Sequence, residues 1–181
     1  QTELKHDLAL KIADDVLNEE NCELQISTFH TQYIIPKTKA FADYMQHEAG
    51  IRVKIINRLS QIREPILKVA VYNPISTAHR AFLKERYENV CDMHLGRDDW
   101  TDFTPLHTNK GSALKTMQQK LKIKPQQCIA FGDYYNDISM FKAVGCPIVI
   151  DSAPENIKKY GKYLTDTVPS ALQEIVNGKV L

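Results

Sequence analysis

The stretch "AFGDYYNDISM", residues 130–140, ends an apolar run with two carboxylates and an amide within five positions. Residues 128–131 read Cys-Ile-Ala-Phe, the continuous apolar pattern of a strand that is buried on both faces. Such strands are typical of parallel sheets, whose ligands bind beyond the carboxyl ends of the strands. We therefore expect Asp133 to lie at a ligand-binding edge, with Asn136 and Asp137 at the start of the next helix.

These three side chains admit two interpretations. In the simpler one, Asp137 or Asn136 caps the helix and Asp133 makes an Asx-turn, and a single such residue favours that interpretation. Two carboxylates and an amide together at this edge instead indicate a hard-cation site, because magnesium prefers few carboxylates, several waters and a phosphate. The pattern therefore favours a hard-cation site, of the kind that Mg²⁺ occupies, at this edge of the sheet.

Lys110 opens a predicted helix over residues 109–121. A lysine at a helix start is most often a solvated surface charge, and the helix dipole slightly disfavours it there. The same position suits a phosphate, since an ammonium group and the N-terminal amides of a helix together hold an anion.

The chain changes its pattern near its middle. The first 98 residues mix amphipathic helices with short strands, which predicts an α+β domain with an antiparallel sheet and helices on one face. From about residue 109, helices and strands alternate, and the apolar strands favour a parallel sheet. We predict an α/β fold with two domains, 1–98 and 99–181.

Residues 99–177 resemble the C-terminal half of the haloacid dehalogenase superfamily, specifically its Cof-type phosphatases. The resemblance rests on "KGSAL" (110–114), "GDYYNDISM" (132–140) and "APE" (153–155), in the order and spacing of that branch. It implies a three-layer parallel-sheet core and, more weakly, a cap domain over residues 1–98. It also implies a magnesium-dependent phosphatase that acts on a small phosphorylated metabolite through an aspartyl-phosphate.

The resemblance also implies individual roles. Lys110 steadies the nucleophile and the phosphate, and Asn136 holds the phosphate or its neighbours. Asp133 is a metal ligand, and Asp137 supports the metal directly or through water.

One part of the family pattern does not occur. The family's nucleophile lies in D-x-D-G-[TS] after a buried strand, and no such motif is present in these 181 residues. The sequence also begins at Gln1, almost within a helical pattern. We therefore expect the nucleophile to lie outside this chain and the isolated chain to be inactive. The alternative is a non-catalytic binding or regulatory module with the same fold. A sugar-phosphate mutase is disfavoured, because mutases usually carry a smaller helical cap.

Composition limits the partners. The formal net charge is +1, so no overall field favours nucleic acid or a membrane surface. No apolar run is long enough to span a bilayer. The four cysteines are scattered without metal spacing, which favours free thiols in a reducing cytoplasm.

If the strand at residues 127–131 has an uncovered edge, we expect the chain to be marginally stable or to form a homodimer.

Overall fold

The structure is a computed structural model that describes residues 3–76, 78–96 and 99–178. The chain divides into two compact units, Gln1–Thr108 and Asn109–Leu181. The division falls after Thr108, whereas the sequence placed it after residue 98, which itself lies outside the described residues. The reason is strand β6 (Trp100–Thr104), which pairs with two strands of the first unit.

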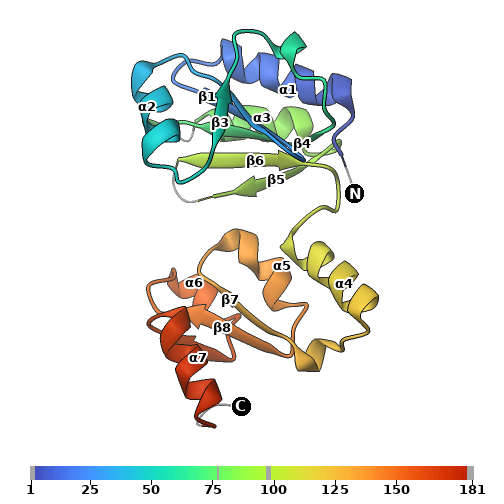
Figure 1. Ribbon diagram of the computed structural model, residues 1–181, viewed down its shortest axis with the longest axis vertical. Coiled ribbons are helices and arrows are strands. Elements are labelled where there is room, and N and C mark those ends of the chain that lie inside the picture. Colours follow the sequence, from blue (N-terminus) through green and yellow to red (C-terminus); the bar gives the residue numbers. More distant parts are fainter. Residues whose placement is uncertain (1–2, 77, 97–98, 179–181) are drawn as a thin grey trace. The chain divides into compact units, whose positions relative to one another are not determined.

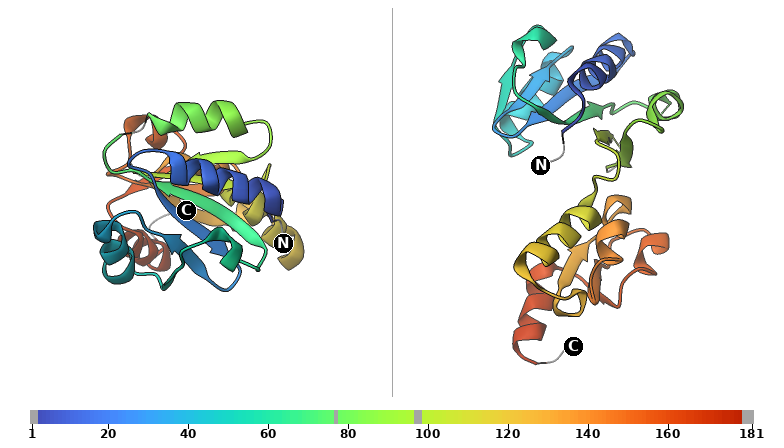
Figure 2. Two further views of the ribbon diagram at one scale, coloured as in Figure 1. Left: turned by 90° about the horizontal axis from the view of Figure 1, so that it is seen from above. Right: turned by 90° about the vertical axis from the view of Figure 1, so that its right-hand side faces the viewer.

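The first unit is built on one six-stranded sheet in its described part, with the strand order β3-β2-β1-β4-β6-β5 (Figure 1). Its elements before β6 are α1 (His6–Asn18), β1 (Glu23–Thr28), β2 (Gln32–Ile35), α2 (Lys39–His47), β3 (Val53–Ile55), β4 (Ile66–Tyr72), α3 (His79–Tyr87) and β5 (Asp92–Leu95). Figure 2 gives two further views of these elements. Strands β1 and β4 lie at the centre of the sheet and pair with each other along their whole lengths.

Helices cover both faces of this sheet. Helices α1 and α3 pack on the main core, which includes Ile26 of β1 and Val71 of β4. Helix α2 packs in a second cluster, with Ile34 of β2 and Tyr72 of β4. Because Val71 and Tyr72 are consecutive in one strand, their side chains point to opposite faces. Helix α2 therefore lies on the face opposite α1 and α3.

The prediction of an antiparallel sheet with helices on one face is wrong in two details. Strands β2 and β3 pair in parallel, while the other pairs are antiparallel. This follows from α2, which connects β2 to β3 as a crossover and so brings β3 back in the same direction. Strands β5 and β6 pair with each other in antiparallel fashion at one end of the sheet.

The second unit is a parallel α/β unit, as predicted. Its sheet order is β7-β8-β9, and both strand pairs are parallel. The elements are α4 (Lys110–Leu121), β7 (Ile129–Gly132), α5 (Ile138–Phe141), β8 (Cys146–Ile150), α6 (Glu155–Lys158), β9 (Tyr163–Thr165) and α7 (Val168–Val176). A 3-10 turn, η3 (Tyr135–Asp137), precedes α5.

Both faces of this sheet are covered too. Val149 of β8 packs with α5 and α6, whereas its neighbour Ile148 packs with α7. The result is the three-layer arrangement of a doubly wound sheet. Strand β7 lies at the end of the strand order, and no other described strand pairs with its outer edge.

Two predictions from composition can be compared with the structure. All four cysteines are free thiols; Cys22, Cys91 and Cys146 are buried and Cys128 is half-buried. Burial raises the pKa of the three buried thiols. Among the described residues, no helix has the length and apolar character that crossing a membrane requires.

Candidate functional site

Helix α4 presents Lys110 as its first residue, and the start of this helix is fixed by a reciprocal cap. The Asn109 side chain accepts a hydrogen bond from the Ser112 N–H at 2.9 Å, and the Asn109 N–H donates to the Ser112 hydroxyl at 3.0 Å. This capping box holds the first turn in place. The Lys110 side chain is half exposed.

Gly111 allows α4 to approach the segment after β7 very closely. A Cβ atom at this position would lie 2.2 Å from the Ser139 carbonyl oxygen, so any larger residue would push the two elements apart. The Gly111 N–H donates to the Ser139 hydroxyl at 3.1 Å. The glycine of the "KGSAL" motif therefore sets the distance between the helix and the strand end.

The carboxyl end of β7 turns around Asp137. This side chain is only 4% exposed, and its Oδ2 accepts the Asp133 N–H at 2.9 Å and the Tyr134 N–H at 3.2 Å. Gly132 makes room for it, because a Cβ there would lie 2.6 Å from the Asp137 carboxyl carbon. The other oxygen, Oδ1, accepts a hydrogen bond from the Lys110 ammonium group.

Asp137 thus joins two segments that are far apart in the sequence. Its carboxylate is buried, and each oxygen receives at least one donor from the protein, which is the condition for keeping such a charge inside a fold. One donor is an ammonium group at the start of α4, and the others are backbone amides after β7. The arrangement fixes Lys110 beside the loop that carries Asp133 and Asn136.

The structure brings the predicted site residues to one place. Asp133 follows β7 directly, while Asn136 and Asp137 lie in η3. Lys110 reaches them from α4 through its contact with Asp137. Their assigned roles toward metal and phosphate stay predictions.

Sequence reasoning missed two features of the site. It did not foresee that Lys110 and Asp137 form an ion pair, because nothing in either segment marks the other as its partner. It also did not single out Ser139, which contacts Gly111 through both its backbone and its hydroxyl. The G-x-x-x-x-D spacing from Gly132 to Asp137 was the signal available for the role of Asp137. It lets the carboxylate fold back toward the backbone amides that follow Gly132.

The described residues contain no group of three or more histidine, cysteine, aspartate or glutamate side chains that could hold a metal ion. What the strand end offers is two carboxylates and one amide, all of them hard oxygen donors. Magnesium commonly uses only one or two carboxylates and completes its octahedron with waters and substrate phosphate. The donor set therefore fits magnesium, and it does not suit a metal that requires a full set of protein ligands.

Several known proteins resemble this chain over part of their length. An HMP-PP phosphatase of Serratia proteamaculans is 33% identical over 76 residues, which are 42% of this chain and 28% of the relative. A 5-amino-6-(5-phospho-D-ribitylamino)uracil phosphatase of Bacillus subtilis is 36% identical over 62 residues, 34% of this chain and 25% of the relative. The matched region thus spans about a quarter of the length of these curated relatives.

Solved structures extend the likeness to nearly the whole chain. A haloacid dehalogenase-like hydrolase from Bacteroides thetaiotaomicron matches 97% of this chain and 68% of its own, with a TM-score of 0.75 and 18% identity. At that identity the match shows a shared fold. A model of the family described as haloacid dehalogenase-like hydrolase matches residues 1–171. The chain therefore belongs to the haloacid dehalogenase-like hydrolases.

Proposed function

We propose that the protein serves the magnesium-dependent hydrolysis of small phosphorylated metabolites through an aspartyl-phosphate. The observation that carries this proposal is the Lys110–Asp137 pair at the carboxyl end of β7. It keeps an ammonium group at the edge of a parallel sheet, where ligands of such sheets bind. The names of the two curated relatives, both phosphatases of phosphorylated compounds, support the same class of substrate.

In this proposal Lys110 binds an anionic oxygen of the phosphate. Its side chain is half exposed, and an ammonium group has three donors, of which Asp137 takes one. Asp137 positions the lysine and the loop. Asp133 is the metal ligand, and Asp137 supports the metal directly or through water. Asn136 holds the phosphate or its neighbours.

Bound magnesium would neutralise charge on the transferring phosphoryl group, which is the main requirement of this chemistry. The chain's own contribution is to orient the phosphate and to keep the lysine fixed. A carboxylate nucleophile splits the hydrolysis into two easier steps. We assign that nucleophile to no aspartate of this chain, because the D-x-D-G-[TS] motif does not occur in residues 1–181.

The missing motif also supports a second candidate, a non-catalytic module that binds a phosphorylated ligand. The coding sequence distinguishes the two candidates. A D-x-D-G-[TS] motif encoded upstream of Gln1 favours the enzyme, and a reading frame without this motif favours the binding module. We further propose a cytoplasmic location, since buried free thiols suit a reducing compartment, and a homodimer that covers the outer edge of β7.

The metal and phosphate assignments can be tested on this chain without activity. Mn²⁺ occupies the same kind of oxygen site as Mg²⁺, and it broadens the ³¹P resonance of phosphate bound next to it. We expect the 181-residue chain to enhance this broadening for inorganic phosphate. Asp133→Asn should reduce the enhancement at least about tenfold, because even the loss of a residue that only positions a metal ligand typically lowers metal affinity by about 10–100-fold. Lys110→Met should weaken phosphate binding more than it weakens Mn²⁺ binding.

Glu174→Gln is the matched control, because Glu174 is an exposed carboxylate on helix α7 of the same unit. It should behave as the wild type. Equal broadening in wild type and Asp133→Asn would refute the metal assignment.

In a separate assay with p-nitrophenyl phosphate and Mg²⁺, we expect no turnover by the isolated chain. Turnover that is lost in Lys110→Met would show that an aspartate of this chain is the nucleophile.

A further inference from the structure

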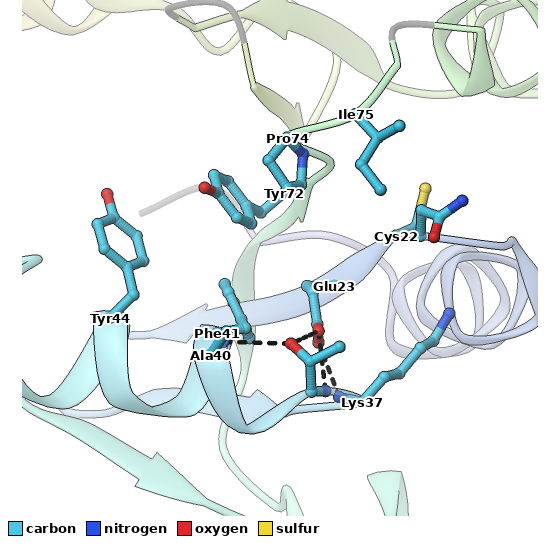
Figure 3. Close-up of a pocket in the computed structure, with 11 residues that line it drawn as sticks. Cys22, Glu23, Lys37, Ala40, Phe41, Tyr44, Tyr72, Pro74 and Ile75 are labelled. Atoms are coloured by element: carbon cyan, nitrogen blue, oxygen red, sulfur yellow. Dashed lines mark hydrogen bonds between the residues drawn. The ribbon is translucent and has the colours of Figure 1, made fainter.

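The first unit contains a cavity of about 250 Å³ between α2 and the turn that follows β4 (Figure 3). The paired strands β1 and β4 form its floor. Glu23 of β1 lies directly opposite Tyr72 of β4, and both line the cavity. Helix α2 forms one wall, and Ile75 from the turn after β4 lies on the other side.

The α2 wall and the floor of the cavity are aromatic. The rings of Phe41 and Tyr44, one helical turn apart on α2, each pack nearly parallel to Tyr72. The ring centroids lie 5.5 and 5.6 Å apart, at interplanar angles of 20° and 17°. Offset stacking of this kind is favourable for flat π-systems. A planar ring that enters the cavity can extend the same stack.

The charged groups of the cavity are already bound by the protein. Glu23 is buried and accepts hydrogen bonds from the Lys37 N–H at 2.7 Å and from the Thr38 N–H at 2.9 Å. The Thr38 hydroxyl donates to the same carboxylate at 2.6 Å. The Lys37 ammonium group donates to the Val16 and Glu19 carbonyl oxygens at 3.0 and 2.6 Å, at the end of α1.

These contacts determine the charge of a suitable ligand. One carboxylate and one ammonium group line the cavity, so their charges cancel, and each is satisfied by protein partners. A charged ligand would lose its hydration without gaining an opposite charge. A neutral ligand avoids that cost. Burial, and then the charge of Asp99, raise the pKa of Tyr72, so its hydroxyl stays protonated.

The mouth of the cavity also favours an apolar occupant. Ile75 lines the cavity and is nevertheless 72% exposed. A ligand under this side chain would remove part of its apolar surface from water, which is favourable. The cavity volume lies below the range of drug-sized sites, and so fits one ring or two fused rings.

We propose that this cavity is a binding site for a neutral, planar aromatic group of one or two rings. The proposal rests on the stacked aromatic rings that line the cavity and on its two charged groups, which are both satisfied by protein partners. It adds a ligand-binding function that does not depend on the phosphate chemistry of the second unit.

Trp100 gives a built-in reporter for the test. It is the single tryptophan of the chain, and its ring centroid lies 5.0 Å from that of Tyr72 and 6.3 Å from that of Phe41. Phenol, benzoate and benzylammonium are neutral, anionic and cationic probes of one size, and none absorbs where tryptophan is selectively excited. We expect phenol to change Trp100 emission saturably, with a dissociation constant on the order of 1 mM. Benzoate and benzylammonium should bind at least about tenfold more weakly.

Two variants at the cavity and one control on the same helix complete the experiment. Ala40 is exposed and lines the cavity, so Ala40→Phe should fill it and weaken phenol binding at least about tenfold. Tyr44→Leu removes a ring of the stack and should weaken phenol binding as well. Gln46→Phe adds the same side chain at another exposed position of α2 and should bind phenol as the wild type does.

The outcomes are decisive in both directions. Far-UV circular dichroism and the urea midpoint establish that each variant is folded. Loss of phenol binding in Ala40→Phe and Tyr44→Leu, with retention in Gln46→Phe, supports the proposal. The absence of a saturable response to phenol overturns it, and so does equal phenol binding in Ala40→Phe and wild type. Tighter binding of either charged probe overturns the assignment of a neutral ligand.

Discussion

Asp137 stabilises the turn that follows strand β7 in the second unit. Its buried carboxylate accepts hydrogen bonds from the Asp133 and Tyr134 amides and from the Lys110 ammonium group. Removing such an acceptor leaves several donors without a partner, and that cost exceeds the net value of the bonds themselves. The side chain therefore stabilises the fold in addition to any role toward phosphate.

We expect Asp137→Ala to lower the free energy of unfolding of the second unit by about 2–4 kcal/mol. Asp137→Asn should cost less, because an amide keeps one oxygen for the backbone donors. Urea unfolding followed by circular dichroism measures both effects. Asp151→Ala, at a more exposed carboxylate of the same unit, should change the midpoint little. A stable Asp137→Ala variant would show that the turn after β7 does not need its carboxylate.

Cys91 makes a contribution to stability that depends on pH. Burial raises the pKa of this thiol from 9.0 to about 11. Between these two values the folded state keeps the proton, whereas the unfolded state loses it. The unfolded state then binds fewer protons, so the free energy of unfolding falls as pH rises, by up to about 1.4 kcal/mol per pH unit for one group.

Cys91→Ala should therefore show a shallower decline in stability from pH 9 to pH 11 than the wild type. The slope is the quantity to compare, because the substitution also changes stability at neutral pH through lost packing. Urea titrations at several pH values give this slope. Parallel slopes for the two proteins would contradict the assignment of a raised pKa to Cys91.

Among the elements, β4 and β7 differ most in how they are paired. Strand β4 has partners on both sides, β1 and β6, and its Val69, Ala70 and Val71 are fully buried. Strand β7 has one described partner, β8, and begins with the partly exposed Ile129. Amide protection follows local pairing and burial.

Hydrogen exchange should accordingly be slow in residues 66–72 and clearly faster in residues 129–132. Mass spectrometry of peptic fragments at several protein concentrations measures this. If the chain dimerises through β7, the exchange of residues 129–132 should slow as the concentration rises. Slow exchange of both strands in a strictly monomeric sample would mean that the outer edge of β7 is covered from within the chain.

Local patterns in the sequence predicted the elements better than their contacts. The helix at residues 109–121 was predicted from its local pattern, and strand β7 was predicted from its continuous apolar run. The face of the sheet that α2 covers was not predicted. Tyr33 and Ile34 of β2 are both buried, so apolar and polar residues do not alternate along this strand to mark one face. The Lys110–Asp137 pair was missed for a related reason: it depends on how α4 packs on the turn, a tertiary contact 27 residues apart.

On the scale of the whole molecule, the two units differ in the size of their cores. The first unit has one extensive cluster that joins α1, α3 and the sheet. The second unit has two small clusters on either face of a three-stranded sheet. Since apolar burial is the main source of stability, we expect the second unit to unfold first.

Urea should therefore give two transitions. Trp100 belongs to the first unit, so its fluorescence should report only the later transition, while far-UV circular dichroism should report both. Limited proteolysis should leave a resistant fragment that ends near residues 105–109. A single transition with coincident midpoints for the two probes would show that the units unfold together.

The strand order of the first unit has a consequence for its synthesis. Strand β1 is entirely buried. Its partner β4 follows much later in the sequence, since Glu23 of β1 pairs with Tyr72 of β4. Strand β4 in turn needs β6, which ends at Thr104. While the ribosome is still making these segments, Leu24 and Ile26 have only β2 and α1 to cover them. Non-local pairing of this kind delays folding and leaves apolar surface open to aggregation. We therefore expect the sheet of the first unit to close late and as a whole, once almost all of that unit has emerged from the ribosome.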